Sequence, residues 1–132
     1  MKNRSNFSSG AVWEDAVGYS RAVKVGDLIE ISGTTSVDRD KVLGAGDPYE
    51  QTKVIIEKFS SVLKEAGGSL SDIIRVRIYV VNIDHWEKIS KAYSEYFRAI
   101  KPATTMVEVS ALITPELLVE MEATAMLNTE QL

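Results

Sequence analysis

Apolar and polar residues alternate in short segments near the beginning and the end of the chain, the pattern expected of half-buried β-strands. Gly26-Asp27 separates the first two of these segments and is typical of a tight hairpin turn. Residues 113–116 are predicted to form the loop between the last two. The predicted strands are residues 19–25, 28–32, 73–81, 105–111 and 118–127, and residues 34–37 either extend the second strand or begin another.

Between these strands, apolar residues recur with a 3.6-residue period that predicts two amphipathic helices. The first begins at Pro48, where a missing N–H costs little, and ends at Gly67-Gly68. The second follows Asp84, which together with Glu87 resembles a capping box, and it ends before Pro102. The apolar stripes are Ile55, Ile56, Phe59, Val62, Leu63 and Ala66 in the first helix and Trp86, Ile89, Tyr93, Tyr96, Phe97 and Ile100 in the second.

The order of these elements predicts a single α+β domain over residues 1–132, in which a mixed β-sheet carries both helices on one face. A chain of 132 residues can bury about two thirds of the surface of its unfolded form. Residues 1–12 lack any periodicity, so we expect them to be a loose N-terminal lead-in, with Trp13 as the residue that orders it.

The strand patterns also predict which side chains the helices cover. The opposite face then carries Glu108, Glu120 and Glu122 together with Arg75 and Arg77. One interpretation is a solvated face with cross-strand ion pairs. The other is a face buried by a second subunit, where neighbouring carboxylates disfavour each other's ionised forms and one becomes a proton carrier. The sets predicted to face the helices are Val76, Ile78 and Val80, then Val107, Val109 and Ala111, then Val119, Met121, Ala123 and Ala125.

Composition narrows the functional classes. The formal net charge is −4 and the basic residues are scattered among acidic ones, so nucleic acid is not expected as the main partner. The absence of cysteine excludes disulfide and thiolate chemistry. No apolar run approaches the roughly 20 residues of a membrane span, and the first six residues do not lead into a secretory signal. We therefore expect a cytoplasmic protein with no membrane partner.

Five segments of the chain, in order and at matching spacing, resemble the RidA/YjgF family. They correspond to the family's opening strand, its Ser-Gly element, the start of its first helix, its second helix and its closing hairpin. The resemblance covers the chain from about Trp13 to Leu127, which makes it specific for the fold although each motif alone is weak. The segments are residues 17–23, 31–34, 50–52 and 92–97, and Pro102-Ala103 with residues 119–123.

The resemblance implies a chorismate-mutase-like fold that assembles as a homotrimer, with three sheets in a central barrel and a small-molecule cleft between subunits. Active members are deaminases that hydrolyse imines and enamines, and this chemistry needs neither a metal nor another cofactor. By the same resemblance Glu120 positions the attacking water and Tyr19 lines the cleft. The family also carries the historical labels of translation initiation inhibitor and endoribonuclease L-PSP.

The chain departs from the family directly after Pro102-Ala103. Active members carry an arginine there that clamps the carboxylate of a 2-imino acid, and this chain has Thr104. Threonine cannot form such a charged bidentate contact, and losing one partner of such a pair typically costs about 2–5 kcal/mol. Arg21 or Arg77 could supply a replacement charge, or could pair with the glutamates instead. The other predicted ligand contacts are Ser32, Thr34, Thr104 and Thr105.

Three functions remain open on these grounds. The first is an imine or enamine hydrolase whose substrate lacks the standard 2-imino carboxylate. The second is a non-catalytic trimer that binds a small molecule and serves regulation or protection. The third, RNA cleavage, is the weakest, because the chain is acidic and its single histidine, His85, is expected at the surface beside a helix.

Overall fold

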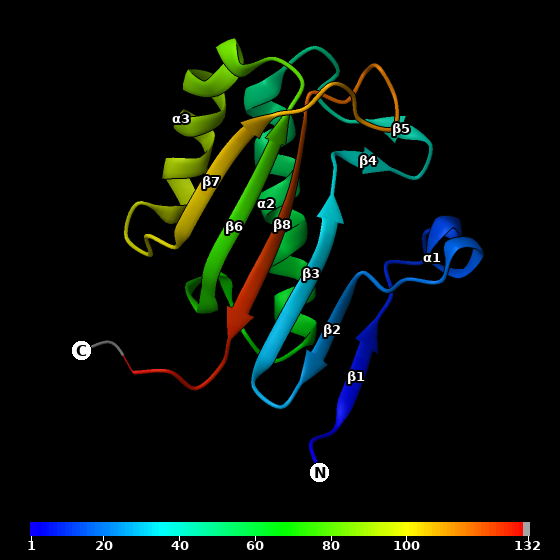
Figure 1. The fold of residues 1–132 in the computed structure, drawn as a ribbon, viewed down its shortest axis with the longest axis vertical. Coiled ribbons are helices and arrows are strands. Elements are labelled where there is room, and N and C mark those ends of the chain that lie inside the picture. Colours follow the sequence, from blue (N-terminus) through cyan, green and yellow to red (C-terminus); the bar gives the residue numbers. More distant parts are fainter. Residues whose placement is uncertain (131–132) are drawn as a thin grey trace.

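The computed structural model describes residues 1–130 and contains one six-stranded β-sheet with two long helices on one of its faces (Figure 1). The first half of the chain forms β1 (Arg4–Phe7), α1 (Val12–Val17), β2 (Ala22–Val25), β3 (Leu28–Thr34), β4 (Val37–Asp38), β5 (Lys41–Val42) and α2 (Pro48–Glu65). The second half forms β6 (Ile73–Val80), α3 (Trp86–Phe97), β7 (Ala103–Glu108) and β8 (Val119–Met126), with 3-10 turns at Leu70–Asp72 and Ile83–His85.

The strand order in the main sheet is β1-β2-β3-β8-β6-β7. All neighbouring strands are antiparallel except β6 and β7, which are parallel and are connected through α3. The small β4–β5 hairpin forms a separate sheet. The predicted α+β fold, a mixed sheet with α2 and α3 on one face, is therefore confirmed (Figure 1).

Local chemistry defines both ends of α2. The side chain of Asp47 accepts a hydrogen bond from the backbone N–H of Glu50 at 3.1 Å, and Pro48 occupies the first turn. Beyond the other end, Gly67 has φ 91°, a left-handed conformation that residues with a Cβ resist. Both predicted ends of this helix are confirmed.

The hydrophobic core lies between the sheet and the two long helices. The apolar stripes of α2 and α3 pack there against alternate residues of β3, β6 and β8. Removing such side chains from water contributes roughly 25 cal/mol per Å² of apolar surface. The largest buried apolar side chains include Phe59, Phe97, Ile29, Ile55, Ile56, Leu63, Ile89, Met121, Val76 and Val80.

Gln51 is a fully buried polar side chain of α2 that ties two loops to this helix. Its Nε2 donates to the carbonyl oxygens of Gly44 at 3.1 Å and Glu116 at 3.0 Å. Its Oε1 accepts from the backbone N–H of Leu118 at 2.9 Å. Because the amide is paired at both its nitrogen and its oxygen, it can join the loop before α2 to the loop before β8 inside the protein.

The N-terminal segment differs from the prediction of a loose lead-in. Residues 4–7 form the edge strand β1, in which Phe7 pairs with Ala22 of β2. In α1 the buried residue is Glu14, whereas Trp13 is 67% exposed and does not order the segment. An edge strand that is largely exposed carries no hydrophobic period, so its formation depends on the free edge of β2 and is not visible in the sequence.

The start of α3 also differs from the prediction. The side chain of Asn82 accepts a hydrogen bond from the backbone N–H of Asp84 at 2.9 Å, so the cap belongs to the short 3-10 turn that precedes the helix. Trp86, predicted in the apolar stripe, is 53% exposed, while Ile89 and Phe97 are buried as predicted.

The alternation of side chains in β7 is the reverse of the prediction. Met106 lies beside Ile78 in the parallel register and packs against the core, whereas Val107 is 42% exposed. Glu108 consequently leaves the predicted carboxylate face, and its side chain accepts from the backbone N–H of Ile83 at 2.9 Å. A one-residue error in phase exchanges every side chain between the two faces, and this edge strand has apolar residues on both.

Replacing Gln51 with leucine should lower the free energy of unfolding by about 2–4 kcal/mol, because it leaves the N–H of Leu118 and two loop carbonyls buried without partners. Urea unfolding monitored by circular dichroism measures this loss. Ser61→Ala, at an exposed position of the same helix, should change stability by less than about 0.5 kcal/mol. Equal stability of Gln51→Leu and wild type would contradict the structural role.

Candidate functional site

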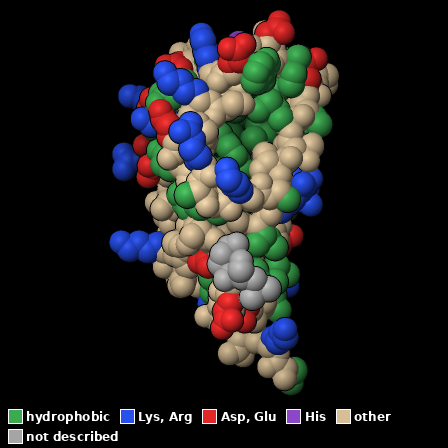
Figure 2. All heavy atoms as spheres, turned by 90° about the vertical axis from the view of Figure 1, so that its left-hand side faces the viewer, with side chains coloured by type: hydrophobic (Ala, Val, Ile, Leu, Met, Phe, Trp, Pro, Cys, Tyr) green, Lys and Arg blue, Asp and Glu red, His purple; other side chains and the backbone are tan. Residues whose placement is uncertain are grey.

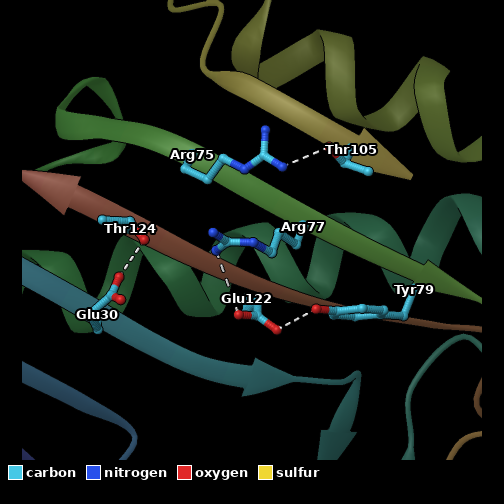
Figure 3. Close-up of polar contacts among 7 residues, drawn as sticks. All are labelled: Glu30, Arg75, Arg77, Tyr79, Thr105, Glu122 and Thr124. Carbon is cyan, nitrogen blue, oxygen red and sulfur yellow. Dashed lines mark hydrogen bonds and ion pairs between the residues drawn. The ribbon is translucent and has the colours of Figure 1, made fainter. Parts of the chain in front are cut away.

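The face of the sheet opposite α2 and α3, called the open face below, carries a network of polar side chains (Figure 3). Nη1 of Arg77 lies 3.7 Å from Oε2 of Glu122, and the hydroxyl of Tyr79 donates to Oε1 of Glu122 at 2.6 Å. Both oxygens of this carboxylate are therefore held in place. Figure 3 also shows Arg75 donating to Thr105 and Thr124 donating to Glu30.

Glu120, the predicted catalytic residue, is half-buried on the open face of β8. Its carboxylate occupies a bay that exists because residue 33 is glycine. A Cβ at position 33 would lie 2.3 Å from Oε2 of Glu120, which is far inside contact distance. The missing side chain of Gly33 therefore makes room for the carboxylate.

The pairing between β3 and β8 is irregular at this glycine. The register shifts between Ile31 and Thr34, so Ser32 and Gly33 together lie opposite one residue, Glu122. Such a β-bulge adds a residue to one strand and bends it locally. A glycine in a strand interior is typical of a bulge or of a close approach by another group, and both occur here.

Arg21 brings a positive charge to the same point. It lies just before β2, where its backbone N–H donates to the carbonyl of Phe7 at 2.8 Å and its carbonyl accepts from the N–H of Ser32 at 3.0 Å. Its guanidinium Nη2 donates to the carbonyl oxygen of Gly33 at 2.5 Å. Gly33 therefore contacts Arg21 through its carbonyl and accommodates Glu120 beside its Cα.

Three effects act on the pKa of Glu120. Burial raises this pKa, the positive charge of Arg21 lowers it, and the negative charge of Glu122 raises it. The result is a pKa above the ordinary value of 4.5. A carboxyl group whose pKa moves toward the working pH is better suited to both accepting and returning a proton.

A pocket of about 490 Å³ opens on the same face, between the first three strands and α1. Tyr19 and Ser32 line it, as do Asn6 and three charged residues. The hydroxyl of Ser32 donates to the carbonyl of Ser20 at 2.6 Å, which fixes this part of the wall. Ser32 is the lining residue that precedes Gly33 in β3, whereas Gly33 and Glu120 do not line the pocket. The charged lining residues are Arg4, Glu14 and Asp15.

Glu14 places a buried carboxylate in the wall of this pocket. Ser9 donates to it from its backbone N–H at 3.2 Å and from its hydroxyl at 2.5 Å. Burial raises the pKa of Glu14, but hydrogen bonds from Ser9 and Ser8 and the charge of Arg21 outweigh burial, so the pKa lies below its ordinary value. Glu14 is therefore a fixed negative charge at neutral pH.

The structure brings together four of the predicted site residues. Tyr19, Arg21, Ser32 and Glu120 all lie at the open face around β3 and its neighbouring strands. Thr34 is separated from them because it is only 1% exposed and its hydroxyl donates to the carbonyl of Ser32 at 2.8 Å. The hydroxyl of Thr34 is therefore engaged within β3, below the open face on which the other four lie.

Thr104 and Thr105 lie on β7, at the opposite edge of the sheet from β1. The hydroxyl oxygens of Thr104 and Tyr93 are 2.6 Å apart, which places Thr104 against α3, and Thr105 accepts from Nη2 of Arg75 at 2.7 Å on the open face. Figure 2 faces the α3 and β7 side and shows hydrophobic side chains gathered in its upper half. Within one chain these threonines do not share a site with Tyr19.

Sequence reasoning did not identify Glu14 and Gly33. Glu14 lies in a short helix with no apolar period, and nothing in its neighbourhood distinguishes it from exposed Asp15. Gly33 did carry a signal, because a glycine that interrupts an alternating strand indicates a bulge or a close approach. The group that approaches Gly33 is the carboxylate of Glu120, which lies far along the chain and could not be identified as its neighbour from the sequence.

No group of three or more His, Asp or Glu residues suited to hold a metal ion occurs within residues 1–130. In the same range no helix combines the length and the apolar content needed to cross a membrane.

Comparison with known proteins shows relatives over nearly the whole chain. The sequence profile of the family described as Endoribonuclease L-PSP matches residues 11–127. A RutC family protein of Pyrococcus abyssi is 43% identical over 108 residues, which are 81% of this chain and 84% of that protein. An uncharacterized protein of Streptomyces coelicolor is 35% identical over 117 residues, 89% of this chain and 87% of its own.

A solved structure agrees with these sequence matches. The crystal structure of a YjgF/YER057c/UK114 family member from Mycobacterium tuberculosis superposes with a TM-score of 0.85 at 43% identity, covering 95% of this chain and all (100%) of that one. The agreement extends over sheet and helices alike, so the arrangement of elements around the site is shared with this relative.

Gly33→Ala should lower the free energy of unfolding by about 1–3 kcal/mol, because the added methyl group and the Glu120 carboxylate cannot occupy the same space. The same substitution in a Glu120→Ala background should cost much less. Chemical denaturation of the four proteins in this double-mutant cycle measures the coupling. Equal costs of Gly33→Ala in both backgrounds would show that the bay is not occupied by Glu120.

Proposed function

Because the chain belongs to the Endoribonuclease L-PSP family, which includes the RidA/YjgF proteins, we propose that it hydrolyses imines or enamines with Glu120 as the reacting carboxyl group. The observation that carries this proposal is the half-buried Glu120 in its bay at Gly33, with a pocket of about 490 Å³ that reaches Ser32 on the same strand. A concave site with a perturbed titratable group is the usual form of a small-molecule reaction site.

The reaction needs little beyond water and a proton carrier. An iminium carbon is electrophilic, so water adds to it once a base accepts one of the protons of water. Glu120 is the base and returns that proton to the nitrogen of the resulting carbinolamine. The carbinolamine hydroxyl then gives its proton to Glu120 as the carbon–nitrogen bond breaks, and ammonia takes up that proton. One iminium ion and one water thus give one carbonyl compound and one ammonium ion.

The charges around the pocket favour a substrate without a carboxylate. Glu14 and Asp15 contribute two negative charges to the lining against the single positive charge of Arg4. The guanidinium of Arg21 is engaged by the carbonyl of Gly33, and Thr104 has no charge to offer. An anionic substrate would therefore meet repulsion without a bidentate clamp, whereas a neutral or cationic imine would not.

The complete cleft, in this proposal, includes a second copy of the chain. The resemblance to RidA/YjgF proteins implies a homotrimer with clefts between subunits, and in one chain β7 lies across the sheet from Tyr19. Large apolar side chains of the open face are exposed in the single chain, namely Val25, Leu28 and Val107. At these positions a second subunit on the open face would remove apolar surface from water.

Sedimentation equilibrium should give the mass of three chains of 14.6 kDa each. Val107→Glu should shift the protein toward smaller species, because it places a charge on the face proposed to be covered. Ser61→Glu adds the same charge to an exposed position of α2 and should leave the mass unchanged. A monomeric wild type would remove the intersubunit cleft from the proposal.

Hydrolysis of imines generated in solution, followed through the carbonyl product and ammonia, tests the activity. Glu120→Gln should lower kcat/KM by about 10²- to 10⁴-fold, because glutamine cannot accept a proton from water. The matched control is Glu30→Gln, which neutralises another carboxylate on the open face and should retain activity. Equal rates for wild type and Glu120→Gln would exclude Glu120 as the base.

The same assay with 2-imino acids tests the substrate class. Thr104→Arg restores the arginine that active relatives carry and should raise activity toward 2-imino acids, whereas Thr104→Val should not. A wild type that binds small molecules but hydrolyses no imine of either class would favour the non-catalytic binding protein. That alternative is supported by the same residue, because Thr104 lacks the family's charge.

A further inference from the structure

Arg21 is held at three points by the chain itself. Its backbone joins it to Phe7 on one side and Ser32 on the other, and its guanidinium donates to the carbonyl of Gly33 at 2.5 Å. An arginine anchored in this way has lost most of the freedom that a surface side chain keeps. Its positive charge therefore has a fixed place beside the bulge in β3.

That place is next to the bay of Glu120. Gly33 makes both contacts. Its carbonyl accepts the hydrogen bond from Arg21, and its missing side chain leaves space for the Glu120 carboxylate. Any movement of the Gly33 peptide would narrow or widen the bay, since a single added carbon atom would already collide with the carboxylate. The hydrogen bond from Arg21 thus fixes the Gly33 wall of the bay, and the positive charge of Arg21 acts on the Glu120 carboxylate in the bay.

The other charged groups near Glu120 are engaged by partners of their own. On the same strand, Glu122 repels Glu120 but is itself held by Arg77 and Tyr79 of β6. From α2, Lys58 donates to the carbonyls of Thr35 and Val37. Burial and the charge of Arg21 lower the pKa of Lys58.

On the side of α1, the buried carboxylate of Glu14 accepts a hydrogen bond from Ser9, and the charge of Arg21 helps to lower its pKa. Within residues 1–130, the positive charge that lowers the pKa of Glu120 is that of Arg21.

We propose that Arg21 is a positioning residue that holds the Gly33 peptide and, through its charge, keeps Glu120 ionised over the pH range in which the site works. This inference rests on the proposed function, in which ionised Glu120 accepts a proton from water. It assigns to Arg21 a role inside the protein in place of the replacement clamp for a substrate carboxylate. The role consists of two separable parts, the hydrogen bond and the charge.

Three substitutions separate these parts. Arg21→Lys keeps the positive charge and a donor, Arg21→Gln keeps a donor without the charge, and Arg21→Met keeps neither. Removing the positive charge should let Glu120 hold its proton to higher pH. The titration of Glu120 should therefore move upward in Arg21→Gln and Arg21→Met and stay near wild type in Arg21→Lys. Glu122→Gln, which removes a negative charge, should move the titration in the opposite direction.

The first measurement is a carboxyl ¹³C NMR titration of full-length protein labelled at glutamate, without substrate, with Glu120→Gln used to assign the signal. The second is the pH profile of kcat/KM for imine hydrolysis. Its acidic limb should move to higher pH in Arg21→Gln and Arg21→Met and remain in place in Arg21→Lys, a change that a merely structural residue would not produce.

The outcomes distinguish this inference from the proposed function. Equal Glu120 titrations in wild type, Arg21→Lys and Arg21→Gln would overturn the role of Arg21, whether or not the protein turns over. A shifted titration without any turnover would retain the influence of Arg21 on Glu120 and reject the hydrolase. If Arg21→Met does not fold, the comparison of Arg21→Gln with Arg21→Lys decides, because these two differ in charge while both keep a donor.

Discussion

The carboxylate of Glu120 can lie where it does only because residue 33 has no side chain. The bulge in β3 places this glycine against β8, and the carbonyl of the same residue holds the guanidinium of Arg21. A half-buried acid beside another acid retains its proton more tightly, and a nearby cation offsets part of that effect. One irregularity in strand pairing thus brings an acid, a cation and a pocket wall to the same point.

The two glutamates on the open face of β8 have different surroundings and therefore different capacities. Glu122 is contacted at one carboxylate oxygen by Arg77 and at the other by Tyr79, in the network of Figure 3. Glu120 is held by the shape of a bay and has a raised pKa. A carboxyl group with a raised pKa is better suited to accept and return a proton. The proposal therefore assigns the proton transfer to Glu120 alone.

Family membership and local chemistry contribute different parts of the functional argument. The relatives show the family and the fold over most of the chain. The site itself holds two carboxylates and one arginine in the lining of its pocket, which is unfavourable for a polyanion such as RNA. Under the proposed function, a small neutral or cationic imine fits these charges better, and Thr104 adds no positive charge that would hold a carboxylate.

The sequence alone determined the fold class, the ends of α2 and the buried faces of β6 and β8, because one-sided burial leaves a period in the chain. It also identified Glu120, Tyr19, Arg21 and Ser32 as candidates. Only the tertiary structure showed that β1 is a strand, that β7 faces the other way and that Thr34 is buried. The tertiary structure alone also joined residues 21, 33 and 120 in one site. Their meeting depends on which distant strands pair and on the bulge in β3, and a local hydrophobic pattern shows only which face each residue takes.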